Sequence, residues 1–169
     1  MKKITLLLLI ATLIVSCGKN KGEQMLYDYQ QNNVKALNFD LADLDYEVQK
    51  IEKITDITSS DSLKIIEEML SPAWEQLEHS LSDTEKFEKL RYAYIGIGAD
   101  KETISELERI GHYYTKISKY PDSLLTTKYR AIYSIKNPML NNTKQTFDKF
   151  YYTNPTQTKF IKEEEIEKE

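Results

Sequence analysis

The sequence predicts an α+β fold in which several helices pack on one face of a small antiparallel sheet. Three observations support this class. The middle of the chain carries apolar residues at helical spacing behind two helix-start signals. The C-terminal third alternates apolar and polar residues, as half-buried strands do, with turn residues between the runs. Finally, 40% of the 169 residues are hydrophobic and 11% are aromatic, which is too much for a disordered chain.

Two elements are predicted before the central helices. Residues 23–37 are rich in polar side chains, with apolar ones at loosely helical spacing, which predicts a short helix. From Leu44 to Val48 apolar residues alternate with acidic and amide residues, as in a half-buried strand. Apolar residues then recur every third position as far as Ile57, so we expect one long strand that contains a bulge.

Three helices follow. The cluster of short oxygen side chains at residues 58–62 can bond to the first backbone amides of a helix, whose apolar stripe then runs from Leu63 to Leu81. The sequence Ser82-Asp83-Thr84-Glu85 is a capping box that opens the next helix. A third helix is expected over residues 100–120 and ends at Pro121.

The remainder is predicted to be a β-meander. Residues 129–135 alternate between apolar and polar side chains, a turn follows at residues 137–142, and residues 143–153 form the next strand. A second turn leads into a strand over residues 158–162. We expect the early strand to join this C-terminal meander in one four-stranded sheet. Residues 163–169 comprise five Glu, one Ile and one Lys, which is typical of a solvated acidic tail.

The first residues of the chain have the composition of a secretion signal. Lys2 and Lys3 precede a nearly unbroken apolar run of twelve residues, Ile4 to Val15. A helix of that length spans about 18 Å, too short for a hydrocarbon core of about 30 Å. The segment therefore predicts a cleaved signal peptide and not a membrane-spanning anchor.

The end of this leader, Ile14-Val15-Ser16-Cys17, resembles the lipobox of bacterial lipoproteins. The resemblance implies that the thiol of Cys17 receives diacylglycerol and that the signal is cut before it. The new N-terminus is then acylated, so two or three acyl chains hold the protein on a membrane. By resemblance to bacterial sorting rules, Gly18 after the cysteine permits transport to the outer membrane.

This resemblance sets the expected organisation of the chain. Residues 1–16 are the signal peptide, residues 17–22 the lipidated cysteine and a short tether, residues 23–162 a single domain, and residues 163–169 the acidic tail. We expect a cell-envelope location at the outer membrane, and the periplasmic face is favoured over the cell surface. The acidic balance of 27 Asp and Glu against 23 Lys and Arg argues against nucleic acid as a partner.

Catalytic and metal chemistry find little support in the sequence. The single Cys excludes an intrachain disulfide framework and any site built from several cysteines. His79 and His112 are the only histidines and are not at the spacing of a metal-binding pair, so we expect no metal, no cofactor and no enzymatic activity. Ser62 and Ser123 lie in Asp-Ser-Leu motifs that resemble an O-glycosylation acceptor of Bacteroidota.

Charge and aromatic residues are unevenly distributed. Residues 61–109 carry 12 acidic and 6 basic side chains, whereas residues 111–162 carry 9 basic and 2 acidic ones. The basic strands either bind an external ligand or are neutralised by the acidic helices and tail. If they bind a ligand, the C-terminal sheet offers a platform that could hold a sugar; its candidate residues are Tyr151, Tyr152, Lys128, Arg130 and Lys149.

Two functions follow from these observations. The first is a non-catalytic, lipid-anchored envelope protein that docks on a protein partner in the periplasm. The alternative is a surface-exposed module that binds glycan or another ligand through Tyr and Lys of the C-terminal sheet.

Overall fold

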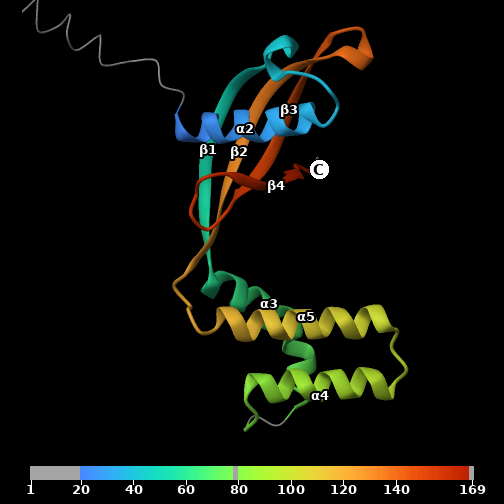
Figure 1. Cartoon of the computed structure of the whole chain (residues 1–169). Helices are drawn as coiled ribbons and strands as arrows, with labels where there is room; N and C mark the ends of the chain where they lie inside the picture. The colour runs from blue at the N-terminus through green and yellow to red at the C-terminus, as the bar shows by residue number, and fades with distance from the viewer. Residues whose placement is uncertain (1–19, 78–79, 168–169) are drawn as a thin grey trace, which may run out of the picture. The chain divides into compact units, whose positions relative to one another are not determined.

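The computed structural model describes residues 20–77 and 80–167, which form an α+β fold (Figure 1). The predicted signal peptide, Cys17 and its neighbours, and His79 lie outside the described residues. The sheet has the strand order β1-β2-β3-β4 and is antiparallel, with strands β1 (Glu47–Thr58), β2 (Leu124–Asn137), β3 (Thr143–Thr153) and β4 (Phe160–Glu165). The early strand therefore pairs with the C-terminal meander, as the sequence predicts.

The described residues divide into two compact units. Unit 1 comprises residues up to Glu52 together with Tyr129–Tyr151 and the chain from Thr158 onward. Unit 2 comprises Lys53–Lys128 and Tyr152–Gln157. The range predicted as one domain, residues 23–162, thus contains two units, and each has a hydrophobic core of its own.

In unit 1, helix α2 (Lys21–Lys35) packs on one face of the sheet. The helix begins two residues before the predicted start, because the side chain of Asn20 accepts a hydrogen bond from the backbone N–H of Glu23 and caps it. Met25 and Leu26 of α2 are buried against three aromatic side chains of the strands, which are Tyr133, Tyr151 and Phe160. A short 3₁₀ helix, η1 (Leu41–Leu44), precedes β1, and a second, η2 (Pro138–Leu140), joins β2 to β3.

Unit 2 is built around helices α3 (Ser59–Trp74), α4 (Asp83–Gly96) and α5 (Lys101–Ile117). Both predicted helix-start signals are capping boxes, formed by Thr58 with Asp61 and by Ser82 with Glu85. The apolar stripes of the three helices converge on one another around a core; its buried residues are Ile66, Phe87, Leu90, Leu107, Tyr114 and Ile117.

A close approach of α4 and α5 explains this packing. Gly111 leaves room on α5 for the ring of Phe87, since a β-carbon at Gly111 would lie 3.1 Å from that ring. The rings of Trp74, Phe87 and Tyr114 then meet with centroids 5.5 to 5.8 Å apart, mostly edge to face. Such contacts add to the burial of apolar area, so the three helices stabilise one another.

The first three residues of the predicted acidic tail belong to a strand. Strand β4 continues through Glu165 instead of ending at residue 162. The physical reason is Lys149 of β3, whose ammonium group binds Glu163 at 2.9 Å and Glu165 at 2.6 Å. Alternate residues of a strand lie on the same face, so one cation can hold both carboxylates and keep the strand paired.

Candidate functional site

Tyr151, one of the two aromatic residues of the predicted ligand-binding platform, is not available to a ligand. Tyr151 is 0% exposed in the core of unit 1, and its hydroxyl accepts a hydrogen bond from the Gln30 amide at 2.9 Å. Burial raises the pKa of its hydroxyl well above the ordinary value. The prediction that Tyr151 contacts a ligand is therefore wrong. The sequence shows that Tyr151 and Tyr152 point to opposite faces, but the packing of α2 decides which of them is buried.

Two of the three cations that were predicted to bind a ligand, Arg130 and Lys149, form ion pairs within the chain. Arg130 donates hydrogen bonds to both carboxylate oxygens of Asp148, at 2.9 and 2.7 Å, and these bonds hold the pKa of Asp148 below its usual range. The side chain of Lys149 is only 12% exposed. Its burial opposes the charged form, but the bonds to Glu165 and Glu163 outweigh burial and raise the pKa of Lys149. A ligand would have to break these pairs before it could use either cation.

The last two predicted residues lie together. The ammonium nitrogen of Lys128 is 5.4 Å from the centroid of the Tyr152 ring, in unit 2. Both side chains are partly exposed, and both make further interactions. Of the five residues predicted for a sugar platform, the structure thus leaves one cation–π pair on a surface, which is a small site for a glycan.

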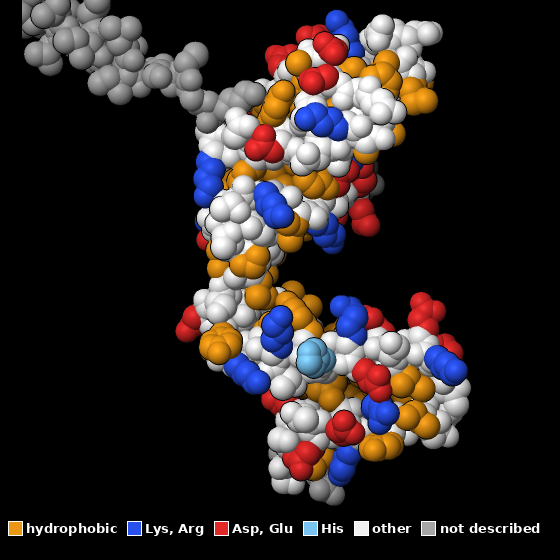
Figure 2. Space-filling view, viewed as in Figure 1, with side chains coloured by type: hydrophobic (Ala, Val, Ile, Leu, Met, Phe, Trp, Pro, Cys, Tyr) orange, Lys and Arg blue, Asp and Glu red, His pale blue; other side chains and the backbone are white. Residues whose placement is uncertain are grey.

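The positive charge of the C-terminal strands is neutralised locally. Lys136 lies 3.4 Å from Asp45, and Lys144 lies 2.8 Å from Glu47, both in unit 1. Lys149 pairs with Glu163 and Glu165 of β4, which confirms that the predicted acidic tail neutralises part of the basic charge of the strands. The other acidic partners found for these strands are Asp45, which lies before β1, Glu47 of β1 and Asp148 of β3. Figure 2 shows basic and acidic side chains side by side on the visible face of this unit.

The two serines of the glycosylation-like motifs come from neighbouring segments. Ser62 lies in the first turn of α3, and Ser123 directly precedes β2. The carbonyl oxygen of Ser123 accepts a hydrogen bond from the backbone N–H of Ser59 at 2.9 Å. Both motifs thus take part in the junction where α3 begins, and their modification stays a prediction.

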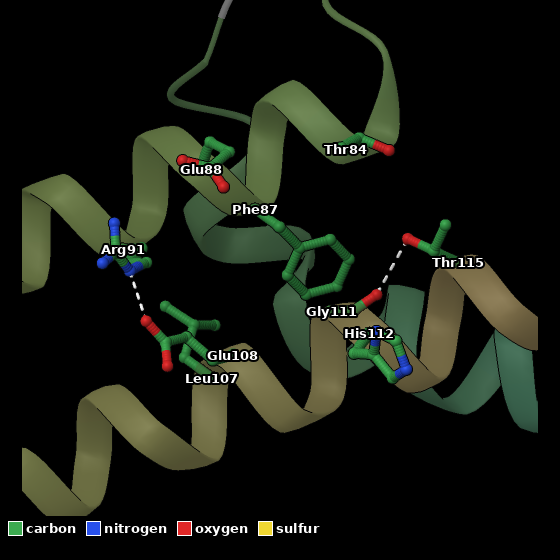
Figure 3. A pocket seen from close by; sticks show the side chains of 9 residues that line it. All are labelled: Thr84, Phe87, Glu88, Arg91, Leu107, Glu108, Gly111, His112 and Thr115. Atoms are coloured by element: carbon green, nitrogen blue, oxygen red, sulfur yellow. Dashed lines mark hydrogen bonds and ion pairs between the residues drawn. The ribbon is translucent and has the colours of Figure 1, made fainter.

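A groove of about 610 Å³ runs between α4 and α5 (Figure 3). The ring of Phe87 points across it toward Gly111, and Arg91 donates a hydrogen bond of 2.5 Å to Glu108 across its other end. His112 stands at its edge, and the hydroxyl of Thr115 donates to the carbonyl oxygen of Gly111. Arg91 and Glu108 therefore engage each other, and the hydroxyl of Thr115 is bonded to its own helix and not to His112.

A second hollow, of about 180 Å³, lies in unit 1 between the end of α2 and the turn from β2 to β3. We call it the apolar socket. Eight of its lining residues are apolar: Val34, Leu37, Phe39, Leu44, Ile135, Pro138, Met139 and Phe147. Met139, which is 82% exposed, completes its edge, and Leu37 is also largely exposed. The socket thus combines an apolar interior with apolar side chains that stand in solvent.

Local hydrogen bonds build both walls of the socket. After α2, Asn38 adopts a left-handed conformation with φ of 64°, and the N–H of Phe39 bonds to the carbonyl oxygen of Val34 at 3.0 Å. This turns Phe39 back beneath the helix. On the opposite wall, the side chain of Asn137 accepts a hydrogen bond from the N–H of Met139 at 2.9 Å and donates one to Gln145 at 2.9 Å. Met139 is therefore held in place by its backbone.

Sequence reasoning missed this socket because residues 137–142 read only as a turn. A signal was present, since a turn rich in Asn and Pro contains two large apolar residues, Met139 and Leu140, that no strand pattern requires. The position of Met139 in the same hollow as Leu37 depends on the pairing of distant segments.

The described residues also bear on metals and membrane spans. Among residues 20–77 and 80–167, no group of three or more His, Cys, Asp or Glu side chains is placed to hold a metal ion. No helix in these ranges is long and apolar enough to cross a membrane.

Comparisons with known proteins find nothing similar. No protein-family model matches the sequence, and searches of curated proteins and of solved structures give no match.

Proposed function

We propose that this chain is a lipid-anchored, non-catalytic protein of the bacterial cell envelope that docks on a protein partner through the apolar socket. The lipobox-like sequence at residues 14–17 supports attachment through Cys17. The proposed location is the periplasmic face of the outer membrane. The observation that carries the docking function is the socket, with Met139 and Leu37 exposed at its edge.

The size of the socket favours a protein over a small molecule. Sites for small ligands commonly enclose about 300–1,000 Å³ and bury most of the ligand. A hollow of about 180 Å³ instead suits one large apolar side chain of a partner. Protein interfaces obtain much of their binding energy from a few such side chains held in pockets. Exposed apolar residues around the pocket exclude water when the partner is bound.

The border of the socket has the polar residues that interfaces need. Lys136, Asn137 and Gln145 line it beside the apolar walls. Lys136 is half-exposed and pairs with Asp45, while Asn137 and Gln145 bond to each other. A polar rim around an apolar centre is the usual anatomy of a protein interface. The glycan-binding alternative has less support, because Tyr151 is buried and Arg130 and Lys149 are held in ion pairs.

Site-specific crosslinking tests the docking function. A photoreactive amino acid in place of Met139, in the full chain expressed in its own cells, is expected to give one discrete adduct with a protein. Adding Leu37→Asp puts a charge at the socket and should reduce the adduct about tenfold or more, since burying an unpaired charge is costly. The matched control is Ile97→Asp, which makes the same kind of change at an exposed residue of unit 2 and should leave the adduct intact. Diffuse adducts, or an adduct that Leu37→Asp does not weaken, contradict the proposal.

Attachment is tested by fractionation. The wild-type chain is expected in the membrane fraction and Cys17→Ala in the periplasmic fraction, because the variant has no thiol to acylate. A wild-type chain in the soluble fraction contradicts lipid anchoring. Protease treatment of intact cells then separates the two faces of the outer membrane, since a periplasmic domain is cut only after that membrane is opened.

A further inference from the structure

The end of α4 and its turn into α5 expose an uninterrupted apolar segment. Residues 92–99 contain no charged side chain, and we call them the apolar tip. Ile97 is 79% exposed, and Tyr92 and Ile95 are also exposed. The buried residues of α4 are Phe87 and Leu90, which belong to the core of unit 2 and precede the tip. The Tyr92 ring lies 5.4 Å from the guanidinium carbon of Arg91, yet Tyr92 remains 64% exposed, so most of its surface and that of Ile97 stands in solvent.

The backbone of the tip is closed by its own hydrogen bonds. The N–H of Gly98 bonds to the carbonyl oxygen of Ile95, and the N–H of Ala99 bonds to that of Tyr94, each at 3.0 Å. Gly98 has φ of 77°, so the helix ends in a Schellman motif. The N–H of Ile97 also bonds within the helix, to Ala93 at 3.1 Å. Unpaired amides are excluded from lipid, so this closure allows the tip to enter an apolar medium.

The charges on either side of the tip cancel. Glu88, Asp100 and Glu102 stand against Lys89, Arg91 and Lys101 over residues 88–102. Arg91 is bonded to Glu108 and so is already paired. Charge complementarity steers many protein partners to their sites, and the tip has no net charge to provide such steering. A lipid surface needs only apolar area and accepts Tyr at its interface, where the ring is buried and the hydroxyl stays hydrated.

We propose that the apolar tip inserts into the interfacial layer of a phospholipid bilayer. The anchored chain would then contact its membrane at a second place besides Cys17. The inference goes beyond the docking function and draws only on the proposed envelope location for its setting. It needs neither the lipid anchor nor the socket, so either proposal can fail while the other stands.

Vesicle binding tests the insertion. A chain that begins at Gly18 keeps every described element and contains no cysteine. It is expected to sediment with phosphatidylcholine vesicles, and Ile97→Asp should lower its partition coefficient about tenfold or more. Met139→Asp is the matched control, because it changes an even more exposed residue of unit 1, and it should leave partitioning within about twofold of wild type. Since the tip has no net charge, added salt or anionic lipid should not strengthen binding.

A fluorescent label reports the site of contact directly. With no other thiol present, Ile97→Cys and Met139→Cys each give a single attachment point for an environment-sensitive dye. The dye at residue 97 should shift to the blue on vesicles and be quenched by lipids brominated on their acyl chains, whereas the dye at residue 139 should not respond. Three outcomes would each overturn the proposal. The chain does not bind vesicles, the two dye positions respond equally, or Ile97→Asp leaves binding unchanged.

Discussion

The two units expose large apolar side chains in opposite settings. In unit 1, Met139 and Leu37 border a hollow whose edge carries Lys136, Asn137 and Gln145. In unit 2, Ile97 and Tyr92 belong to a helix end without charged residues and with its backbone amides bonded. A hollow with a polar rim can select one side chain of a protein, whereas a closed apolar turn suits a lipid interface. Exposure alone therefore does not identify a partner.

The cores of the units also differ. Unit 1 buries tyrosines between a helix and strands that are far apart in sequence, and its Gln30 and Tyr151 are joined by a hydrogen bond. Unit 2 takes its buried core from three consecutive helices. Its Tyr114 donates a hydrogen bond to Glu67 at 2.7 Å from the edge of the aromatic cluster. Unit 1 thus depends on long-range pairing and unit 2 on neighbouring segments.

The largest expected effect comes from emptying the core of unit 1. Tyr151→Ala removes a fully buried ring and leaves Gln30 without its partner, so we expect a loss of about 3–5 kcal/mol in the free energy of unfolding. Hydrogen exchange of β2 and β3 in unit 1 measures that loss. Trp74, the only tryptophan, lies in unit 2, so its fluorescence follows the other core in the same sample. We expect the Trp74 transition to move less. If both transitions move together, the two cores unfold as one cooperative structure and the comparison fails.

A smaller effect is expected where α4 and α5 touch. Gly111→Val places carbon atoms against Phe87 and should destabilise unit 2 by about 1–3 kcal/mol, seen as a lower denaturation midpoint of Trp74 fluorescence. Gly96→Ala is the control, because a β-carbon there meets no atom within 4 Å and should be neutral or stabilise by up to about 1 kcal/mol. A Gly111→Val chain as stable as wild type shows that the close approach does not hold these helices together.

The smallest effect is expected at an ion pair of unit 1. Arg130 lowers the pKa of Asp148, so the pair stabilises the fold at pH values above the ordinary carboxyl pKa and loses that contribution as pH falls through the lowered folded pKa. Because both side chains are more than a third exposed, Arg130→Ala should cost only about 0.2–1 kcal/mol near neutral pH and nothing in strong acid.

An NMR titration of the Asp148 carboxyl group checks the assignment. Its pKa should rise in Arg130→Ala and change less in Lys50→Ala, since the effect of Lys50 on Asp148 is weaker. An unchanged pKa in Arg130→Ala shows that the bidentate pair does not form in solution.

Local signals in the sequence determined most of the elements. The capping box at Ser82 and the turn residues before Thr143 predict α4 and β3 at their observed starts, because both signals depend on neighbours a few residues away. The pairing of the early strand with the meander also follows from the strand order that the sequence indicates. The leader with Cys17 is likewise a property of the sequence alone and gives the predicted location.

Tertiary structure decided which face of each element is buried and where the candidate sites lie. Strand alternation separates Tyr151 from Tyr152 but cannot say which of them α2 covers. An apolar stripe requires a partner without naming it, and only the packing shows that the stripes of α3, α4 and α5 meet each other. The socket likewise arises where the end of α2 meets the turn after β2, about a hundred residues later. Periodicity fixes which side of an element is apolar, and only packing between distant segments fixes what that side contacts and which apolar residues remain exposed.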